Sequence, residues 1–338
     1  MQKKKTSIFN KLLYFFNSIF AIVLLFSYLL PFVSPNTIPV FAVLSLLVPV
    51  LIIINIVFAI YWLIKLKKKF YLSGFVLIIG WMFSSPFYKI TGKNSSLNDD
   101  IKVMSYNVRM FNYYKWSEDT TLGKQIVDFI SEKKPNILAI QEFYDSDSID
   151  FNYPYQFIKT KSEKDKFGLA IYSKYKIINS GSLDLENSSN NIIFVDIVKQ
   201  KDTIRVYNLH LESLKINPNK ENFGQENSEK LLKRLENSFK KQAHQTKKFL
   251  AHEQQWKGKK IVCGDFNNTS YSWVYNQISK NKKDAFVEAG KGFGKTFNYW
   301  FPMRIDFIFM DETLKVNQFK TFSVEYSDHF PIQARINW

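Results

Sequence analysis

The sequence predicts an α/β or α+β fold in which β-sheets pack on each other and are covered by helices, behind an apolar helical region. Two observations support this prediction. Short β-branched or aromatic runs alternate with helical patterns after about residue 98, whereas the first 98 residues contain long apolar stretches and no Asp or Glu. We therefore divide the chain into residues 1–95 and residues 96–338.

Three apolar stretches fill the first region, at residues 12–32, 38–64 and 70–87. Each is about long enough to cross a hydrocarbon core of roughly 30 Å at about 1.5 Å rise per residue. A signal peptide would explain only the first stretch, and no small-residue cleavage site precedes the second. We therefore expect a membrane domain with three transmembrane helices.

Lysine clusters predict how this domain is oriented. Residues 3–5 and Lys11 flank the first stretch, and residues 65–69 separate the second stretch from the third. By the positive-inside rule both clusters are cytoplasmic, so three crossings place the region after about residue 90 outside. In a Gram-negative cell that is the periplasm, with the chain a multi-pass protein of the inner membrane. If the third and shortest stretch does not span, the same region lies in the cytoplasm.

The charge and the cysteine content narrow the classes of partner. Of the formal +16, the first 98 residues carry +10, and the remaining 36 basic and 30 acidic residues leave +6 for the rest. Much of the positive charge therefore belongs to membrane flanks and not to a nucleic-acid groove. The single cysteine, Cys263, excludes an internal disulfide, and its apolar neighbours predict a buried side chain.

The second region alternates between strand and helix patterns. Helices are predicted at residues 121–133, where apolar residues share one face, and at residues 226–255, which are amphipathic and rich in charge. We interpret the longer helix as the cover of a sheet, with nucleic-acid binding by its lysines as the alternative. Strands are predicted at residues 101–106, 137–140, 168–172, 192–198, 203–209, 260–262, 305–310, 321–324 and 332–336.

Polar residues stand at the ends of several of these runs. Asn107 ends the first run, Glu142 follows the second, and His210 follows the fifth. A strand buries its apolar residues and delivers its last polar residue to the rim of the sheet. Taken singly, each residue has an ordinary structural explanation that fits equally well. Asn107 can be a turn former, Glu142 an exposed strand terminator, and His210 a buried structural histidine. Together with the motifs that follow, they predict one site.

Residues 263–267, Cys-Gly-Asp-Phe-Asn, form the sharpest pattern. Gly264 lets the backbone turn or approach a ligand closely, and Asp265 and Asn267 face the same way if the strand continues. A carboxylate that orients or deprotonates water, beside an amide that stabilises phosphoryl oxygens, is the pairing that phosphoester hydrolysis needs.

Two carboxylates and an imidazole follow near the C-terminus. Asp306 begins an apolar run, and Asp328 and His329 precede another. This set allows one Asp to hold the tautomer of the histidine through a hydrogen bond while the other binds a metal.

In this order the motifs resemble the endonuclease/exonuclease/phosphatase superfamily, which includes DNase I, AP endonucleases, inositol polyphosphate 5-phosphatases and neutral sphingomyelinases. The resemblance covers about residues 100–338 and is most specific at residues 264–267 and 327–329. It implies a four-layer sandwich of two mixed β-sheets flanked by helices. It also implies a hydrolase site at the edge of the sheets that uses Mg²⁺, or Mn²⁺ in its place.

The resemblance also implies roles. Glu142, Asn107 and Asp328 are expected to bind the metal. His210 is expected to be a second catalytic or phosphate-contacting histidine. Asp265 is expected to orient the attacking water, with Asn267 in contact with the phosphate. Asp306 is expected to pair with His329, which is also catalytic. Whether Asp265 or His329 is the general base stays open.

One departure from the family pattern bears on the substrate. Exonuclease III-like members and AP endonucleases carry an Asp two residues after the first Asn, where this chain has Arg109, as DNase I-like members do. This disfavours repair of abasic sites. Residues 292–297 resemble a Gly-x-Gly-x-Thr-Phe loop of membrane-anchored bacterial members. We expect Arg109, Thr296 and Arg304 to contact substrate.

The resulting hypothesis is a membrane-anchored, Mg²⁺-dependent phosphodiesterase or phosphatase whose catalytic domain faces the periplasm. Its expected partners are the lipid bilayer and a phosphate ester, either a lipid headgroup or nucleic acid, with no obligate protein partner. An extracytoplasmic DNase I-like endonuclease is the main alternative. A non-catalytic binding module is another, although none of the motif positions is missing.

Overall fold

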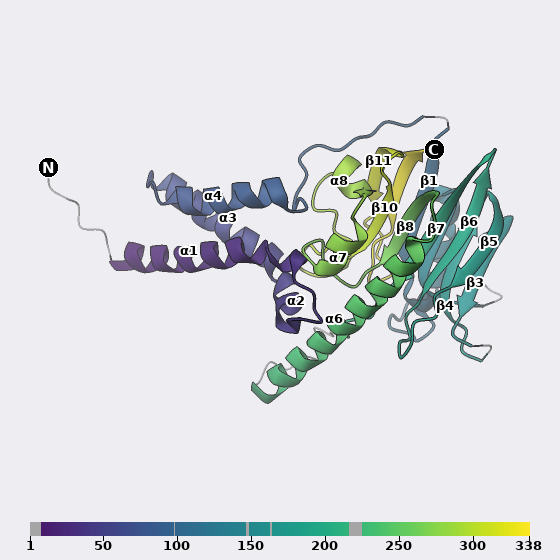
Figure 1. The fold of residues 1–338 in the computed structure, drawn as a ribbon, viewed down its shortest axis with the longest axis horizontal. Coiled ribbons are helices and arrows are strands. Elements are labelled where there is room, and N and C mark those ends of the chain that lie inside the picture. Colours follow the sequence, from purple (N-terminus) through teal and green to yellow (C-terminus); the bar gives the residue numbers. More distant parts are fainter. Residues whose placement is uncertain (1–7, 98, 147–148, 163, 216–224) are drawn as a thin grey trace.

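The computed structural model describes residues 8–97, 99–146, 149–162, 164–215 and 225–338. A group of apolar helices extends away from a β-sandwich, and the long helix α6 (Gln225–Glu253) runs along the outside of the sandwich (Figure 1). The two predicted regions therefore differ in architecture as well as in composition.

The N-terminal helices are less regular than the three predicted spans. They are α1 (Ile8–Ser27), the 3-10 turn η1 (Leu30–Phe32), α2 (Pro39–Ser45), α3 (Val48–Ile64) and α4 (Phe70–Phe83). By length and composition, one helix of the described residues can cross a membrane, Ile8–Phe32, or two if the pair α2 and α3 counts as one span.

The expectation of three full-length spans is therefore corrected. The second stretch breaks before Pro49, with a bend of 51° between α2 and α3, because a proline lacks the N–H that would continue a helix and is accepted in a first turn. The third stretch forms only 14 helical residues.

The first sheet has six strands in the order β11-β12-β1-β2-β4-β3. The pair β1 and β2 is parallel, and the other pairs are antiparallel. Their bounds are β1 (Ile101–Asn107), β2 (Ile137–Tyr144), β3 (Tyr155–Thr160), β4 (Phe167–Ser173), β11 (Lys315–Thr321) and β12 (Ile332–Asn337).

The second sheet has the same design, with six strands in the order β5-β6-β7-β8-β10-β9. Here β7 and β8 are the parallel pair. The bounds are β5 (Lys176–Ser182), β6 (Ile192–Lys199), β7 (Asp202–His210), β8 (Lys259–Asp265), β9 (Lys282–Asp284) and β10 (Asp306–Asp311).

The two sheets pack face to face, and helices cover their outer faces. Val103 of the first sheet and Val206 of the second belong to one buried core between the sheets. Helix α5 (Leu122–Lys133) covers the first sheet with Ile126, whereas α6 and α7 (Trp273–Ile278) cover the second with Phe249 and Val274. The four-layer sandwich is therefore confirmed.

The strand and helix predictions hold where the pattern is long. Both predicted helices are confirmed as α5 and α6, but the strand expected at residues 321–324 lies earlier, as β11. The structure adds β3, β5, β9, α7, the short helix α8 (Ala285–Ala289) and the 3-10 turn η2 (Arg109–Asn112), which the sequence analysis missed. The missed strands β3 and β5 lie at sheet edges and are half exposed, so their apolar pattern is weak.

The helical region is docked on the sandwich through two apolar contacts. Tyr271 lies in a cluster with Leu30 and Val48, and Ala42 of α2 packs with Phe239 of α6. Figure 1 shows α2 beside α6. One end of the helical region therefore contacts the sandwich directly.

Candidate active site

Five polar side chains meet because the two parallel strand pairs end at the same edge of the sandwich. Asn107 and Glu142 lie at the carboxyl ends of β1 and β2. His210 and Asp265 end β7 and β8 and are paired in register, and Asp306 begins β10 opposite Asp265. The carboxyl ends of adjacent parallel strands share an edge, so the sandwich brings residues of both sheets together.

The amide of Asn107 connects the two sheets. Its Nδ2 donates to Oε1 of Glu142 at 3.2 Å and to Oδ2 of Asp265 at 3.0 Å. Its Oδ1 accepts the backbone N–H of Arg109 at 3.1 Å. Asn107 is buried, so this amide holds one carboxylate from each sheet in a defined relative position.

Glu142 is delivered by an irregularity in β2. The register between β2 and β4 shifts between Ile140 and Phe143, and Glu142 has φ of 49°, in the left-handed region. Such a bulge re-aims a side chain, here toward the cavity. Burial raises the pKa of Glu142, and Asp328 adds to the effect. A cation bound next to Glu142 would instead stabilise the ionised carboxylate.

His210 is buried and lies between two carboxylates. Its Nε2 is 3.7 Å from Oδ2 of Asp265 and 3.9 Å from Oε1 of Glu142, and it has no hydrogen-bond partner within the described residues. Burial lowers the pKa of His210, and Asp265 opposes that effect. An unpaired buried nitrogen at this point is suited to contact a bound oxyanion or water.

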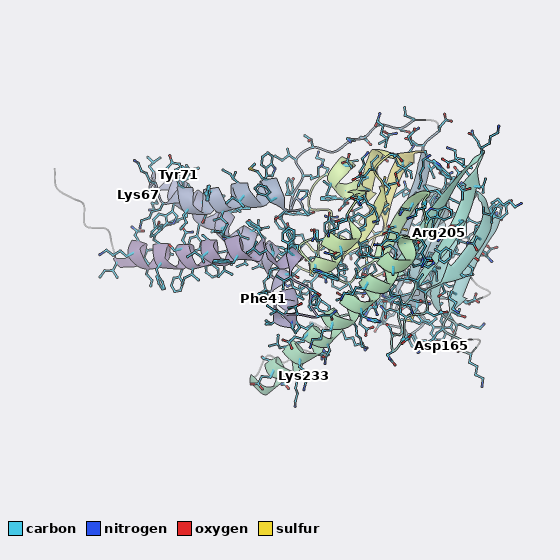
Figure 2. All side chains as sticks on the ribbon, viewed as in Figure 1. Phe41, Lys67, Tyr71, Asp165, Arg205 and Lys233 are labelled. Atoms are coloured by element: carbon cyan, nitrogen blue, oxygen red, sulfur yellow. The ribbon has the colours of Figure 1, made fainter. Side chains whose placement is uncertain are left out.

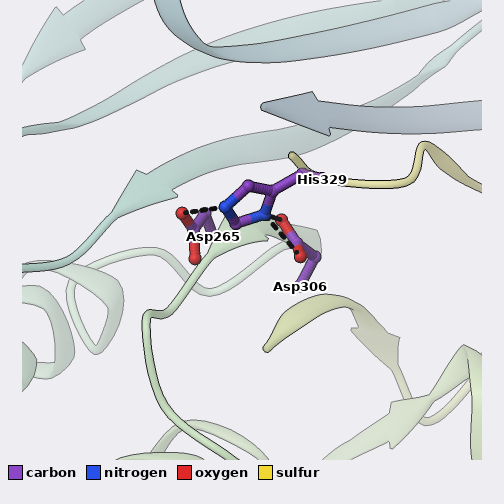
Figure 3. Close-up of side chains that lie close together, drawn as sticks. All are labelled: Asp265, Asp306 and His329. Atoms are coloured by element: carbon purple, nitrogen blue, oxygen red, sulfur yellow. Dashed lines mark hydrogen bonds and ion pairs between the residues drawn. The ribbon is translucent and has the colours of Figure 1, made fainter. Parts of the chain in front are cut away.

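His329 is held between two aspartates (Figure 3). Its Nδ1 contacts both carboxylate oxygens of Asp306, at 3.0 and 3.2 Å, and its Nε2 lies 3.7 Å from Oδ2 of Asp265. Burial opposes the charged imidazolium, but Asp306 and Asp265 outweigh it and raise the pKa of His329 well above its usual range. Burial also raises the pKa of Asp265 to about 6, although His329 acts in the other direction.

Asp328 faces the same cavity as Glu142. Its Oδ2 lies 3.3 Å from Nη1 of Arg109, and the guanidinium of Arg109 lies 4.5 Å from the centre of the Trp116 ring. Arg109 and Asp328 are both partly exposed, so a ligand can reach them. A contact between Arg109 and substrate stays a prediction.

Asn267 reaches the site by a turn, and not by the continued strand that the sequence suggested. Strand β8 ends at Asp265, Asn267 has φ of 49°, and its backbone N–H donates to Oδ1 of Asp265 at 2.8 Å. Gly264 is required just before this turn, because a Cβ there would lie 1.9 Å from the carbonyl oxygen of Leu209. Asn267 nevertheless lines the cavity.

Two of the residues expected to contact substrate instead make contacts within the fold, and a substrate role for them stays a prediction. Thr296 is fully buried, and its Oγ1 accepts the backbone N–H groups of Ile305 and Asp306, so it supports the start of β10. Arg304 is also buried, and it pairs with Asp284 at 2.6 Å and donates to Ser85. Both side chains therefore have structural partners within the fold.

The charge balance of the site fits a divalent cation. Four carboxylates, those of Glu142, Asp265, Asp306 and Asp328, meet one guanidinium and the imidazolium of His329, which leaves two negative charges without a partner. Uncompensated buried charge is costly, and oxygen ligands suit Mg²⁺.

Two ligand sets can be compared for this cation. Ligand atoms of Asp265, Asp306 and His329 lie within 4.8 Å of one another. However, Asp306 already holds the ring of His329, whose pKa favours the protonated form that cannot bind a metal. We therefore favour Glu142 and Asp328, which face the cavity, with Asn107 beside them.

The cavity next to these residues has a volume of about 340 Å³. Glu142, Asp328 and His329 form one part of its lining. The rest is largely apolar and was missed in the sequence analysis: Leu46, Val50, Leu214, Trp300, Phe301 and Met303. Only the aromatic density of residues 297–301 could have hinted at this wall, because apolar residue types are common and their meeting depends on tertiary packing.

A second missed feature joins the sheets beneath the site. Nε2 of Gln141 donates to Oδ1 of Asn208 at 2.6 Å, and Nδ2 of Asn208 donates to the carbonyl oxygens of Ile140 and Ala170. Both amides are fully buried. They position the ends of β2 and β7. Gln141 directly precedes Glu142 and Asn208 lies two residues before His210, so the sequence could have pointed to both amides.

Comparison with known proteins gives two family matches. Residues 104–329 match the Endonuclease/Exonuclease/phosphatase family, and residues 10–87 match a family described only as a domain of unknown function. No curated protein matches the chain.

Several solved structures share the fold. The endonuclease/exonuclease/phosphatase from Bacteroides vulgatus is 18% identical, with 70% of this chain and 98% of that chain covered and a TM-score of 0.53. The human Nocturnin catalytic domain with bound sulfate is 17% identical, with 72% and 96% covered and a TM-score of 0.52. The Bacteroides thetaiotaomicron mannosyl-6-phosphatase is 16% identical, with 70% and 100% covered and a TM-score of 0.52. At these identities the likeness concerns the fold alone.

Proposed function

Because the chain belongs to the endonuclease/exonuclease/phosphatase family and is a metal-dependent phosphoric ester hydrolase of that type, we propose that it is a membrane-anchored enzyme that uses Mg²⁺. The observation that carries the proposal is the Asn107 amide, which joins Glu142 and Asp265 across the two sheets. It places a candidate metal ligand, which lines the cavity, beside a candidate base buried directly behind it.

The residues of the chain divide the chemistry as follows. Glu142 and Asp328 would hold the cation with Asn107 beside them, and a cation there would supply neutralisation of charge on the phosphoryl oxygens. Asp265 orients the attacking water, and it shares the proton-transfer role with His329. The proposed reaction is in-line attack of water on phosphorus, with the ester oxygen as the leaving group.

The remaining residues position and stabilise. Asp306 fixes the ring of His329 so that Nε2 points toward Asp265, as the contacts at 3.0 and 3.7 Å indicate. His210 and Asn267 contact the phosphoryl oxygens in this scheme, because both lie beside Asp265 and His210 has a free Nε2 within the described part of the chain.

A membrane location is supported by how the N-terminal helices distribute polarity. Asn17 of α1, Asn55 of α3 and Ser73 of α4 are fully buried and hydrogen-bonded to one another between the helices. Large apolar side chains face outward, for example Phe75 at 63% and Trp81 at 79% exposure. Polar contacts inside and an apolar exterior suit lipid and would be costly in water.

The proposed orientation rests on the lysine-rich turn between α3 and α4. Lys67 and Tyr71 lie at the end of the helical region far from the sandwich (Figure 2). We propose the extracytoplasmic side for the sandwich, because these lysines lie at the opposite end of the helical region and lysine clusters stay in the cytoplasm. In a Gram-negative cell this is the periplasm.

The direct test is hydrolysis of bis(p-nitrophenyl) phosphate by the purified full-length chain in detergent. We expect release of p-nitrophenol with Mg²⁺ and loss of activity in EDTA that is restored by excess Mg²⁺. Activity that is indifferent to EDTA would contradict the metal-dependent mechanism. Cleavage of plasmid DNA at a higher rate than any lipid phosphate would favour the endonuclease alternative.

A further inference from the structure

Residues of the N-terminal helical region form one wall of the active-site cavity. Leu46, directly before the break between α2 and α3, and Val50, in the first turn of α3, line the same cavity as Glu142 and His329. These two segments are more than ninety positions apart in the chain. The helical region is therefore more than a tether, since it completes the wall of the site.

The cavity has a polar end and an apolar end. Glu142, Asn267, Asp328 and His329 form the first. The second combines Leu46 and Val50 with the aromatic segment Phe297–Phe301 and with Met303, and Lys215 is the one Lys or Arg in the lining. A nucleic-acid duplex needs a broad cationic surface, which this lining does not supply.

The surroundings continue the apolar end toward the outside. Leu44 and Leu47 on the helical side are 41% and 50% exposed, and Trp300 on the sandwich side is 79% exposed. Trp300 is part of the cavity lining, and Leu47 and Leu44 lie one and two residues from the lining residue Leu46 in the chain. Aromatic and aliphatic side chains that are exposed beside a membrane region are suited to the headgroup and acyl boundary of a bilayer.

On the basis of the proposed function, we propose that the substrate is an amphiphilic phosphate ester of the bilayer, whose phosphate sits among the polar residues and whose hydrocarbon lies between the α2–α3 break and the Phe297–Met303 segment. The volume of about 340 Å³ suits a headgroup phosphate and the first part of a tail, because small-molecule sites start at about 300 Å³. Hydrolysis breaks the bond between phosphorus and the ester oxygen, water supplies the hydroxyl, and the leaving oxygen takes a proton.

The test compares methyl p-nitrophenyl phosphate with dodecyl p-nitrophenyl phosphate, both hydrolysed by the full-length chain in nanodiscs with Mg²⁺. We expect kcat/KM to be roughly tenfold or more higher for the dodecyl ester, because burial of several methylenes contributes to binding. Val50→Phe, which fills the apolar end, should lower kcat/KM for the dodecyl ester toward the value for the methyl ester. Val57→Phe is the matched control, since Val57 lies on the same helix at 60% exposure and does not line the cavity.

A second readout does not depend on turnover. A dodecyl phosphonate with a diazirine on one of the tail carbons nearest the phosphorus should, after irradiation, label the peptides that carry Leu46, Val50 or Met303. Equal kcat/KM for the two esters, or labelling only elsewhere, would overturn tail binding while the hydrolase proposal stands. Absence of Mg²⁺-dependent hydrolysis of both esters would overturn the hydrolase proposal itself.

Discussion

At the scale of single residues, the site depends on how a few carboxylates are shared. Asn107 donates to Glu142 and to Asp265, and Asp306 holds His329, so these three ionisable side chains are each held by a residue from another segment. Removing one member therefore has effects that depend on whether it holds the cation, moves a proton or positions another group.

Glu142→Gln removes a candidate metal-binding charge and preserves the size of the side chain. We expect Mg²⁺-dependent hydrolysis to fall by at least on the order of a hundredfold, since even loss of an outer partner of a metal site costs that much. The melting temperature should be little changed. Glu132→Gln, on the exposed face of α5, is the control. Full activity in Glu142→Gln would refute the ligand assignment.

Asp306→Asn separates the positioning of His329 from metal binding. The amide no longer favours the imidazolium, so we expect kcat to fall by roughly a hundredfold or more, with KM and the Mg²⁺ concentration for half activity little changed. Asp311→Asn, at the other end of β10, should leave all three quantities as they are. An equal loss in both variants would mean that β10 is simply destabilised.

Arg304→Ala tests whether this arginine supports the fold or binds substrate. It removes the guanidinium that pairs with the buried carboxylate of Asp284 at 2.6 Å, while the hydrogen bonds from Tyr275 and Phe286 remain, so we expect a loss of about 3–5 kcal/mol in the free energy of unfolding. Thermal unfolding monitored by circular dichroism gives the direction of the change. An unchanged melting temperature with a raised KM would instead restore the substrate role.

At the scale of elements, polar side chains connect the apolar helices and give them a defined arrangement. Nε1 of Trp62 donates to Asn17, Nδ2 of Asn17 donates to Ser73, and Ser73 donates to Asn55. Asn55 also donates to the carbonyl oxygen of Phe20, so it is a junction of α3 with α1 and α4. The network selects one packing among the many that apolar surfaces allow.

Asn55→Leu removes this junction and leaves Ser73 without its acceptor. We expect a loss of about 1 kcal/mol in the stability of the helical region in nanodiscs, as is typical of hydrogen bonds between helices in lipid. The readout is the melting temperature of the near-ultraviolet signal. Val57→Leu, on the outward face, should not change it, and an effect of equal size there would contradict the network as the cause.

At the scale of the whole molecule, the proposed orientation has a direct readout. The single native cysteine, Cys263, is buried, so an introduced cysteine can be labelled selectively. A membrane-impermeant maleimide added to intact spheroplasts should label Lys161→Cys on the sandwich. It should label Lys68→Cys, in the turn between α3 and α4, only after the membrane is permeabilised. The reverse pattern would place the sandwich in the cytoplasm.

Much of the site was predictable because its residues stand at the ends of long buried strands. Glu142, His210, Asp265 and Asp306 each border an apolar run, and the parallel pairs then bring them to one edge. Thr296 could not be interpreted in the same way, since its residue type suits a ligand and a buried backbone acceptor equally well. Its neighbours in space decided between the two.

Sequence alone determined the order of the motifs, the apolar N-terminal region and the class of fold, because alternation of apolar residues and strand-ending polar residues are local patterns. Only the tertiary structure decided that the bend between α2 and α3 forms one wall of the cavity and that Arg304 forms an ion pair with Asp284. These contacts join segments far apart in the chain. Their energies depend on shape and burial, which no local pattern encodes.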